Sequence, residues 1–155
     1  EFMSGYEDVF FSFTHASDPI GLAAADFMID YLDNDFYLDI AEKTKKIHIA
    51  LNQLLSRIEN EELQLLVTSY PGKIVFSVKE PNMMIKLKTF LQKELLSKNI
   101  LFNMFLAIAE DHTDEDINNF LKAMNLIVDK LNHQSFDIDL ETDGLLVKPV
   151  FRVQK

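Results

Sequence analysis

Apolar residues recur along the chain at helical spacing in two places, and a third helix is indicated by its start signal. Residues 36–60 and 113–131 carry apolar side chains every three or four positions, which predicts two amphipathic helices. Asp18 followed by Pro19, an N-cap residue before the first helical position, predicts a third helix that runs to Leu32. The first turns of that helix are small and apolar on all sides, which indicates a helix packed closely by several neighbours.

Four shorter apolar stretches predict strands. Residues 9–14 are rich in aromatic and β-branched side chains, which favour a pleated strand. Residues 63–70 and 74–78 flank the turn dipeptide Pro71-Gly72, so they predict a hairpin. The fourth stretch covers residues 100–109 and is apolar through most of its length.

The entry to the last helix carries a capping box. In Thr113-Asp114-Glu115-Asp116, the Thr113 hydroxyl can bond the amide of Asp116 while the Asp116 carboxylate reaches back. The three acidic residues also suit the positive end of the helix dipole. A further helix over residues 83–97 separates the hairpin from the fourth strand. We therefore expect an α/β domain of the two-layer α+β kind, in which helices cover a sheet of about three to four strands.

Composition and charge exclude several classes of function. The chain has 155 residues, the length of one domain with or without a tail. Its 15 Lys and Arg against 25 Asp and Glu leave a net charge of -10, which argues against a nucleic-acid partner. The absence of Cys excludes disulfides and Cys-ligated zinc and fits a cytoplasmic location. No apolar run reaches the ~18 residues of a membrane-spanning helix, and we find no signal-peptide pattern.

The inventory of catalytic side chains is small. The four histidines have no metal-ligand spacing, and we expect structural roles for them, including help from His112 in orienting the capping turn. Four acidic residues alternate along a predicted extended tail, where we expect them to keep an edge soluble. We find no EF-hand loop, glycine-rich phosphate loop or nucleophile motif. The histidines are His15, His48, His112 and His133, and the tail acids are Asp137, Asp139, Glu141 and Asp143.

One polar turn is a candidate binding site. Ser12, Thr14 and Ser17 lie between the first predicted strand and the helix that starts at Pro19. Their hydroxyls and the backbone amides of the turn suit an anion near the positive end of that helix. A turn that only caps its own helix explains the same residues. Taken alone, the residues leave both interpretations open.

Several motifs stand in the order found in class III aminotransferases. Residues 9–25 resemble the segment in which a Thr, a short polar turn and a Pro precede an alanine-rich helix. Residues 71–78 and 99–103 resemble two strands of the C-terminal domain of those enzymes, and residues 109–117 resemble the entry to their final helix. Residues 148–153 resemble the ending of some relatives. The likeness is strongest to glutamate-1-semialdehyde aminotransferases, which are 2,1-aminomutases, and their relatives in polysaccharide biosynthesis.

This resemblance implies a part of a larger enzyme. Residues 1–33 would be the end of the large domain and a linking helix, residues 34–133 the small α/β domain, and residues 134–155 a C-terminal tail. The cofactor of the family is pyridoxal 5'-phosphate, held by a Lys and paired by an Asp that both precede the Thr segment. We therefore expect no catalytic residue here, no transaminase or aminomutase activity in the chain alone, and two partners, the missing large domain and a second subunit of a homodimer.

Few site residues carry over from the resemblance. Thr14 matches the Thr whose hydroxyl and amide bind the cofactor phosphate across a dimer interface, and Phe13 would contribute its backbone beside it. Residues 15–18 depart from the aromatic-Gly-Gly or Gly-Asn pattern that is more usual at this turn. Arg152 is left without a role, and no metal ligand carries over.

A second hypothesis stays open beside the first. The chain could be a stand-alone, non-enzymatic module for effector binding or dimerisation, which the thin catalytic inventory favours. Several apolar stripes in a chain of this length also predict an exposed apolar face, where a missing domain would dock.

Overall fold

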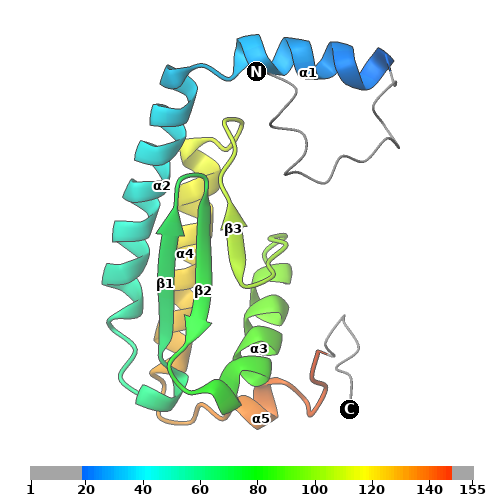
Figure 1. Cartoon of the computed structure of the whole chain (residues 1–155). Coiled ribbons are helices and arrows are strands. Elements are labelled where there is room, and N and C mark those ends of the chain that lie inside the picture. The colour runs from blue at the N-terminus through cyan, green and yellow to red at the C-terminus, as the bar shows by residue number, and fades with distance from the viewer. Residues whose placement is uncertain (1–18, 148–155) are drawn as a thin grey trace. The chain divides into compact units, whose positions relative to one another are not determined.

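A computed structural model of the chain describes residues 19–147 (Figure 1). The chain divides between Leu38 and Asp39 into two units, of which the first contains α1 and the second everything from Asp39 onward. The elements are α1 (Pro19–Tyr31), α2 (Asn34–Leu55), η3 (Glu61–Leu63), β1 (Leu65–Tyr70), β2 (Lys73–Val78), η4 (Pro81–Met83), α3 (Met84–Leu96), β3 (Phe105–Ala107), α4 (Asp114–Leu131) and α5 (Ile138–Glu141).

Helix α1 begins at Pro19, as the sequence predicted. None of its residues is buried among those that the structure describes, and its close packing on several sides stays a prediction. Such an apolar helix is built for burial. The exposed large side chains are Ile20, Leu22, Phe27, Met28, Ile29 and Tyr31.

The three described strands form one antiparallel sheet in the order β1-β2-β3. The predicted hairpin is confirmed, with Val67 opposite Phe76. Gly72 completes its turn with φ of 77°, a left-handed conformation that glycine adopts without a Cβ penalty. The mixture of helices with this sheet confirms the α+β class. The strand predicted at residues 9–14 lies outside the described residues.

The strand predicted over residues 100–109 is wrong over most of that range, because β3 spans only Phe105–Ala107. The resemblance to a strand at residues 99–103 is not matched either, since these residues form no strand. Asn99 and Met104 have positive φ angles of 62° and 58°. Left-handed residues interrupt extended backbone, so the run of apolar residues forms a loop before the short strand.

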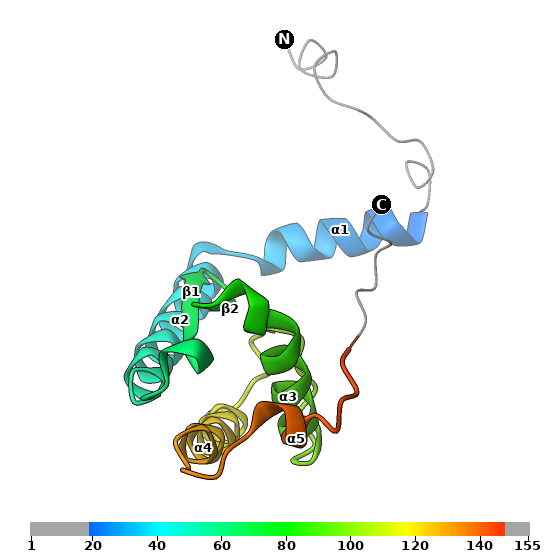
Figure 2. The same cartoon turned by 90° about the horizontal axis from the view of Figure 1, so that it is seen from below.

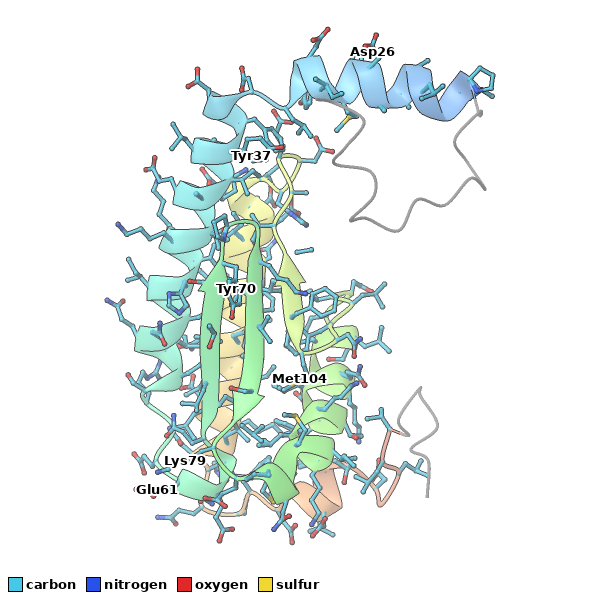
Figure 3. The ribbon with its side chains drawn as sticks, viewed as in Figure 1. Asp26, Tyr37, Glu61, Tyr70, Lys79 and Met104 are labelled. Atoms are coloured by element: carbon cyan, nitrogen blue, oxygen red, sulfur yellow. The ribbon has the colours of Figure 1, made fainter. Side chains whose placement is uncertain are left out.

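The hydrophobic core lies between one face of the sheet and the helices α2, α3 and α4 (Figure 2). Its fully buried side chains include Leu51 and Leu55 of α2, Ile74 of β2, Leu87, Phe90, Leu91 and Leu95 of α3, and Met124, Ile127 and Val128 of α4. The opposite face of the sheet is open. It presents Leu66, Tyr70 and Phe105, of which Tyr70 is marked in Figure 3.

Helix α2 ends five residues before the predicted Asn60. Side chains from elsewhere in the second unit bind the backbone there. The Gln64 amide donates to the Leu55 carbonyl at 3.0 Å, and the Asn132 amide donates to the Arg57 carbonyl at 2.7 Å. These bonds satisfy carbonyl groups that a longer helix would have used internally, so the helix stops at Leu55.

The prediction that the acidic residues after α4 lie along an extended edge is wrong. Asp137 instead caps the short helix α5 by accepting a hydrogen bond from the amide of Asp139 at 2.9 Å. The acids that follow pair with lysines of α3 and α4, so they hold α5 against the helices. The pairs are Lys86–Asp139 at 2.7 Å, Lys93–Asp143 at 2.8 Å and Lys130–Glu141 at 2.7 Å.

Candidate functional site

The residues that the sequence singled out for cofactor binding lie outside the described part of the chain. These are Thr14 and Phe13, together with Ser12 and Ser17 of the same polar turn. Arg152 also lies outside it. The phosphate-binding turn therefore stays a prediction, and any site built from described residues must be sought elsewhere.

The three described histidines have structural partners, in line with the expectation from the sequence. His112 accepts a hydrogen bond from the Ala109 amide at 2.9 Å through Nδ1, which orders the turn between β3 and α4. His48 lies 2.9 Å from the side-chain amide of Asn52, and His133 lies 2.8 Å from the hydroxyl of Ser135. Over residues 19–147, no three His, Asp or Glu side chains are grouped so as to hold a metal ion.

The predicted capping box is confirmed at the start of α4. The Thr113 hydroxyl accepts from the Asp116 amide at 3.2 Å, and the Asp116 carboxylate accepts from the Thr113 amide at 2.9 Å. Hydrogen bonds from the hydroxyl and then the amide of Thr113 lower the pKa of Asp116. Lys43 also donates to the His112 carbonyl at 3.1 Å, so α2 helps to hold the turn from β3 to α4.

Beside this turn lies a groove of about 910 Å³ between the segment 98–108 and the first half of α4. Its apolar lining combines both walls with one residue of α2. Its apolar residues include Ile100, Phe102, Leu106, Ile117, Phe120 and Ile47. Apolar walls of this kind suit the binding of a partly apolar ligand or chain segment.

Large apolar side chains are also exposed where the groove meets solvent. Leu101 is 88% exposed and Leu126 is 56% exposed, although both are among the lining residues. Phe105 of β3 is 41% exposed. A rim of exposed leucine and phenylalanine around an apolar floor is typical of an interaction surface.

The charged side chains of the groove are mainly basic, in a chain whose net charge is -10. Lys98 and Lys122 are exposed and form no ion pair with any residue of the described range. The lining carboxylate, Asp116, is engaged by Thr113. The groove therefore combines an apolar floor with two cations that are available to a ligand.

This arrangement suits the binding of a ligand. The groove contains His112, but its Nδ1 is used by the Ala109 amide, and none of its lining residues is a Ser, Cys or Tyr that could act as a nucleophile. Sequence reasoning did not find the groove. The signal for the groove in the sequence was the unusual density of apolar residues in 100–108. That density predicted a strand, whereas most of these residues form one wall of the groove.

Among residues 19–147, none of the helices has the length and apolarity needed to cross a membrane. Comparison of the chain with protein-family models, with curated proteins and with solved structures gives no match.

Proposed function

We propose that the chain is the C-terminal portion of a pyridoxal-phosphate-dependent aminotransferase or aminomutase of class III, similar to glutamate-1-semialdehyde aminotransferases. The observation that supports the proposal is the order of the motifs along an α+β domain. The motif at residues 71–78 includes strand β2, and the motif at residues 109–117 covers the capped entry to α4. The motif at residues 99–103 falls in a loop and contributes nothing to this argument.

In this proposal the chain would cover the active site, close over the substrate and complete the phosphate site of a second subunit. Thr14 would donate its hydroxyl and its amide to phosphate oxygens, bonds that are strengthened by the charge of the acceptor. The substrate would be an amino or keto compound. The reaction would transfer an amino group, with pyridoxal phosphate as the electron sink.

The ion-paired lysines among the described residues do not suit a covalent site for this cofactor. A Schiff-base Lys must be sheltered and close to the cofactor ring. The ion-paired lysines that the structure describes instead have side chains at least 32% exposed and are held by carboxylates. The proposal places the Lys and the Asp that the chemistry needs in the large domain, and the chain alone is expected to be inactive.

The test is to express the chain together with the coding sequence upstream of it. We expect the longer protein to bind pyridoxal phosphate through a lysine and to show the absorbance of that adduct, whereas the 155-residue chain does not. A longer protein that binds no cofactor would contradict the proposal. A reading frame that starts at Met3 would also contradict it and would leave the non-enzymatic module.

The role of Thr14 can be tested in the same longer protein. Thr14→Val removes a charge-assisted hydrogen bond that is worth about 1.5–3 kcal/mol, so the affinity for pyridoxal phosphate should fall roughly 10- to 100-fold. Thr68→Val, on the open face of the sheet, is the matched control and should leave the affinity unchanged. Equal affinities for the two variants would remove Thr14 from the phosphate site.

A further inference from the structure

Strand β3 ends the sheet and leaves one edge without a partner in the described range. The amide of Phe76 donates to the Met104 carbonyl and the amide of Ile108 donates to the Gly72 carbonyl, each at 2.8 Å. In an antiparallel pair, the residues that bond to the neighbouring strand alternate with residues whose N–H and C=O point the other way. Phe105 and Ala107 therefore direct their backbone groups away from β2.

The groove adjoins this free edge. Phe105 and Ala107 line it together with Phe120 and Ala123 of α4. Leu106, between the two edge residues, packs against the core on the helix side of the sheet. A chain laid beside β3 would continue the same alternation, so every second side chain would point toward α4 and the others toward the open face.

The charges around the edge favour an acidic occupant. Lys98 and Lys122 line the groove without ion pairs in the described range, and Lys73 lies 5.0 Å from the centre of the Phe105 ring. Asp116, the acidic residue of the lining, stays charged, but its carboxylate is engaged by hydrogen bonds from Thr113. Carboxylates on the occupant would meet these lysines, and a basic occupant would be repelled.

We propose that the free edge of β3 and the adjoining groove bind an extended acidic segment of a partner protein, which adds to the sheet as a fourth strand. Main-chain hydrogen bonds to Phe105 and Ala107 supply the pairing, and apolar side chains at alternate positions fill the groove against α4. Asp or Glu side chains at the intervening positions lie on the open face, on the side of Lys73, while Lys98 and Lys122 add positive charge at the groove. An exposed sheet edge is normally covered or blunted in proteins, and this binding would cover it.

The first test uses the full chain labelled with ¹⁵N and a blocked synthetic peptide, Asp-Val-Glu-Ile-Asp-Val-Glu. In the free protein, we expect the amides of Phe105 and Ala107 to exchange rapidly with solvent. The peptide should protect both amides and shift the resonances of Lys98 and Lys122. The amide of Leu106, opposite Ile74 in the ladder to β2, is the internal control and should be protected throughout.

Two control peptides isolate the two parts of the mechanism. The same sequence with N-methyl groups on alternate residues loses main-chain donors and should not protect Phe105 or Ala107. A peptide with Lys in place of each Asp and Glu should bind at least threefold more weakly, since like charges would face Lys98 and Lys122. Equal binding of the acidic and basic peptides would overturn the proposed charge selection.

A charge reversal on the protein tests the contribution of the groove lysines to binding. Lys122→Glu should weaken binding of the acidic peptide about three- to fivefold, the range of an exposed ion pair. Lys45→Glu, at an exposed position of α2 outside the groove, should leave it unchanged. Neither substitution touches the core, so both variants should fold.

Three results would overturn the proposal. Slow exchange of Phe105 and Ala107 in the free protein at all concentrations would show that another part of the chain occupies the edge. Protection that appears only at high protein concentration would show a second copy there. Absence of peptide-dependent shifts at β3 would show that the edge binds no such segment. None of these outcomes bears on the proposed aminotransferase relationship, because the inference does not depend on it.

Discussion

Lys130 of α4 joins three elements, and its removal is a sharp test of what holds α5 in place. Its Nζ lies 3.1 Å from Glu94 of α3 and 2.7 Å from Glu141 of α5, and 5.5 Å from the centre of the Phe90 ring. The two carboxylate side chains are only 20% and 31% exposed. Lys130→Met keeps most of the packing of the stem and removes the charge, so it isolates the polar contacts.

The expected loss follows from how far these groups are sheltered. Fully exposed pairs contribute about 0.2–1 kcal/mol, whereas sheltered hydrogen bonds to charged groups contribute about 1.5–3 kcal/mol. Because the Lys130 side chain is 36% exposed, we expect each ion pair to contribute near the lower end of the range for sheltered hydrogen bonds to charged groups. With two pairs and a weak cation–π contact of about 0.5 kcal/mol, we expect Lys130→Met to lower the free energy of unfolding by about 2 kcal/mol after partial solvent screening.

Urea unfolding of the full chain measures this difference, and Lys46→Met provides the matched control. Lys46 forms a pair of similar length with Glu42, 2.9 Å, but both side chains are at least 67% exposed. We expect that substitution to leave the free energy of unfolding almost unchanged, because solvent screens an exposed pair. Equal losses for the two variants would refute the argument that burial decides the strength of these pairs. Faster amide exchange across α5 in Lys130→Met alone would support it independently.

Three further outcomes are expected. Thr113→Ala should lower the free energy of unfolding by about 1 kcal/mol through loss of the cap, while Thr113→Ser should restore it; equal urea midpoints would contradict the capping role. Met124→Ala should cost about 2–5 kcal/mol, because Met124 is fully buried, and Leu126→Ala, at 56% exposure, under about 0.5 kcal/mol by the same assay. Hydrogen bonding to Glu141 raises the pKa of Lys130 above the ordinary 10.5, so its stabilisation is complete below pH 10.5 and is lost as pH rises through the higher folded value. Thermal unfolding across that alkaline range should show a slope that Lys130→Met lacks.

Local signals in the sequence were sufficient where the structure is decided locally. Thr113 and Asp116 are three residues apart and cap α4 through hydrogen bonds to each other. The dipeptide Pro71-Gly72 likewise sets the turn between β1 and β2, with Gly72 in the left-handed conformation that the hairpin requires. Both features were therefore predicted with their residues.

The sequence failed where residues far apart decide the outcome. Helix α2 stops at Leu55 because Gln64 and Asn132 bind carbonyl groups at its end. The tail acids fold back because lysines more than ten residues away pair with them, as Lys130 does with Glu141. The groove forms because residues 98–108 lie beside α4, with left-handed backbone at residues that are not glycine. No single segment of the sequence therefore predicts it.

The short helix α5 has a consequence for limited proteolysis. Four residues cannot hold a helix on their own, so α5 keeps its conformation through its contacts and through its covalent link to α4. Phe136, in that link, packs its ring 5.2 Å from the ring of Phe90, and Ile138 is buried. Cleavage just after α4 would turn an intramolecular association into a bimolecular one and forfeit an effective concentration on the order of millimolar. Water would then reach the region around Phe90, even though the cleaved peptide bond lies outside the core.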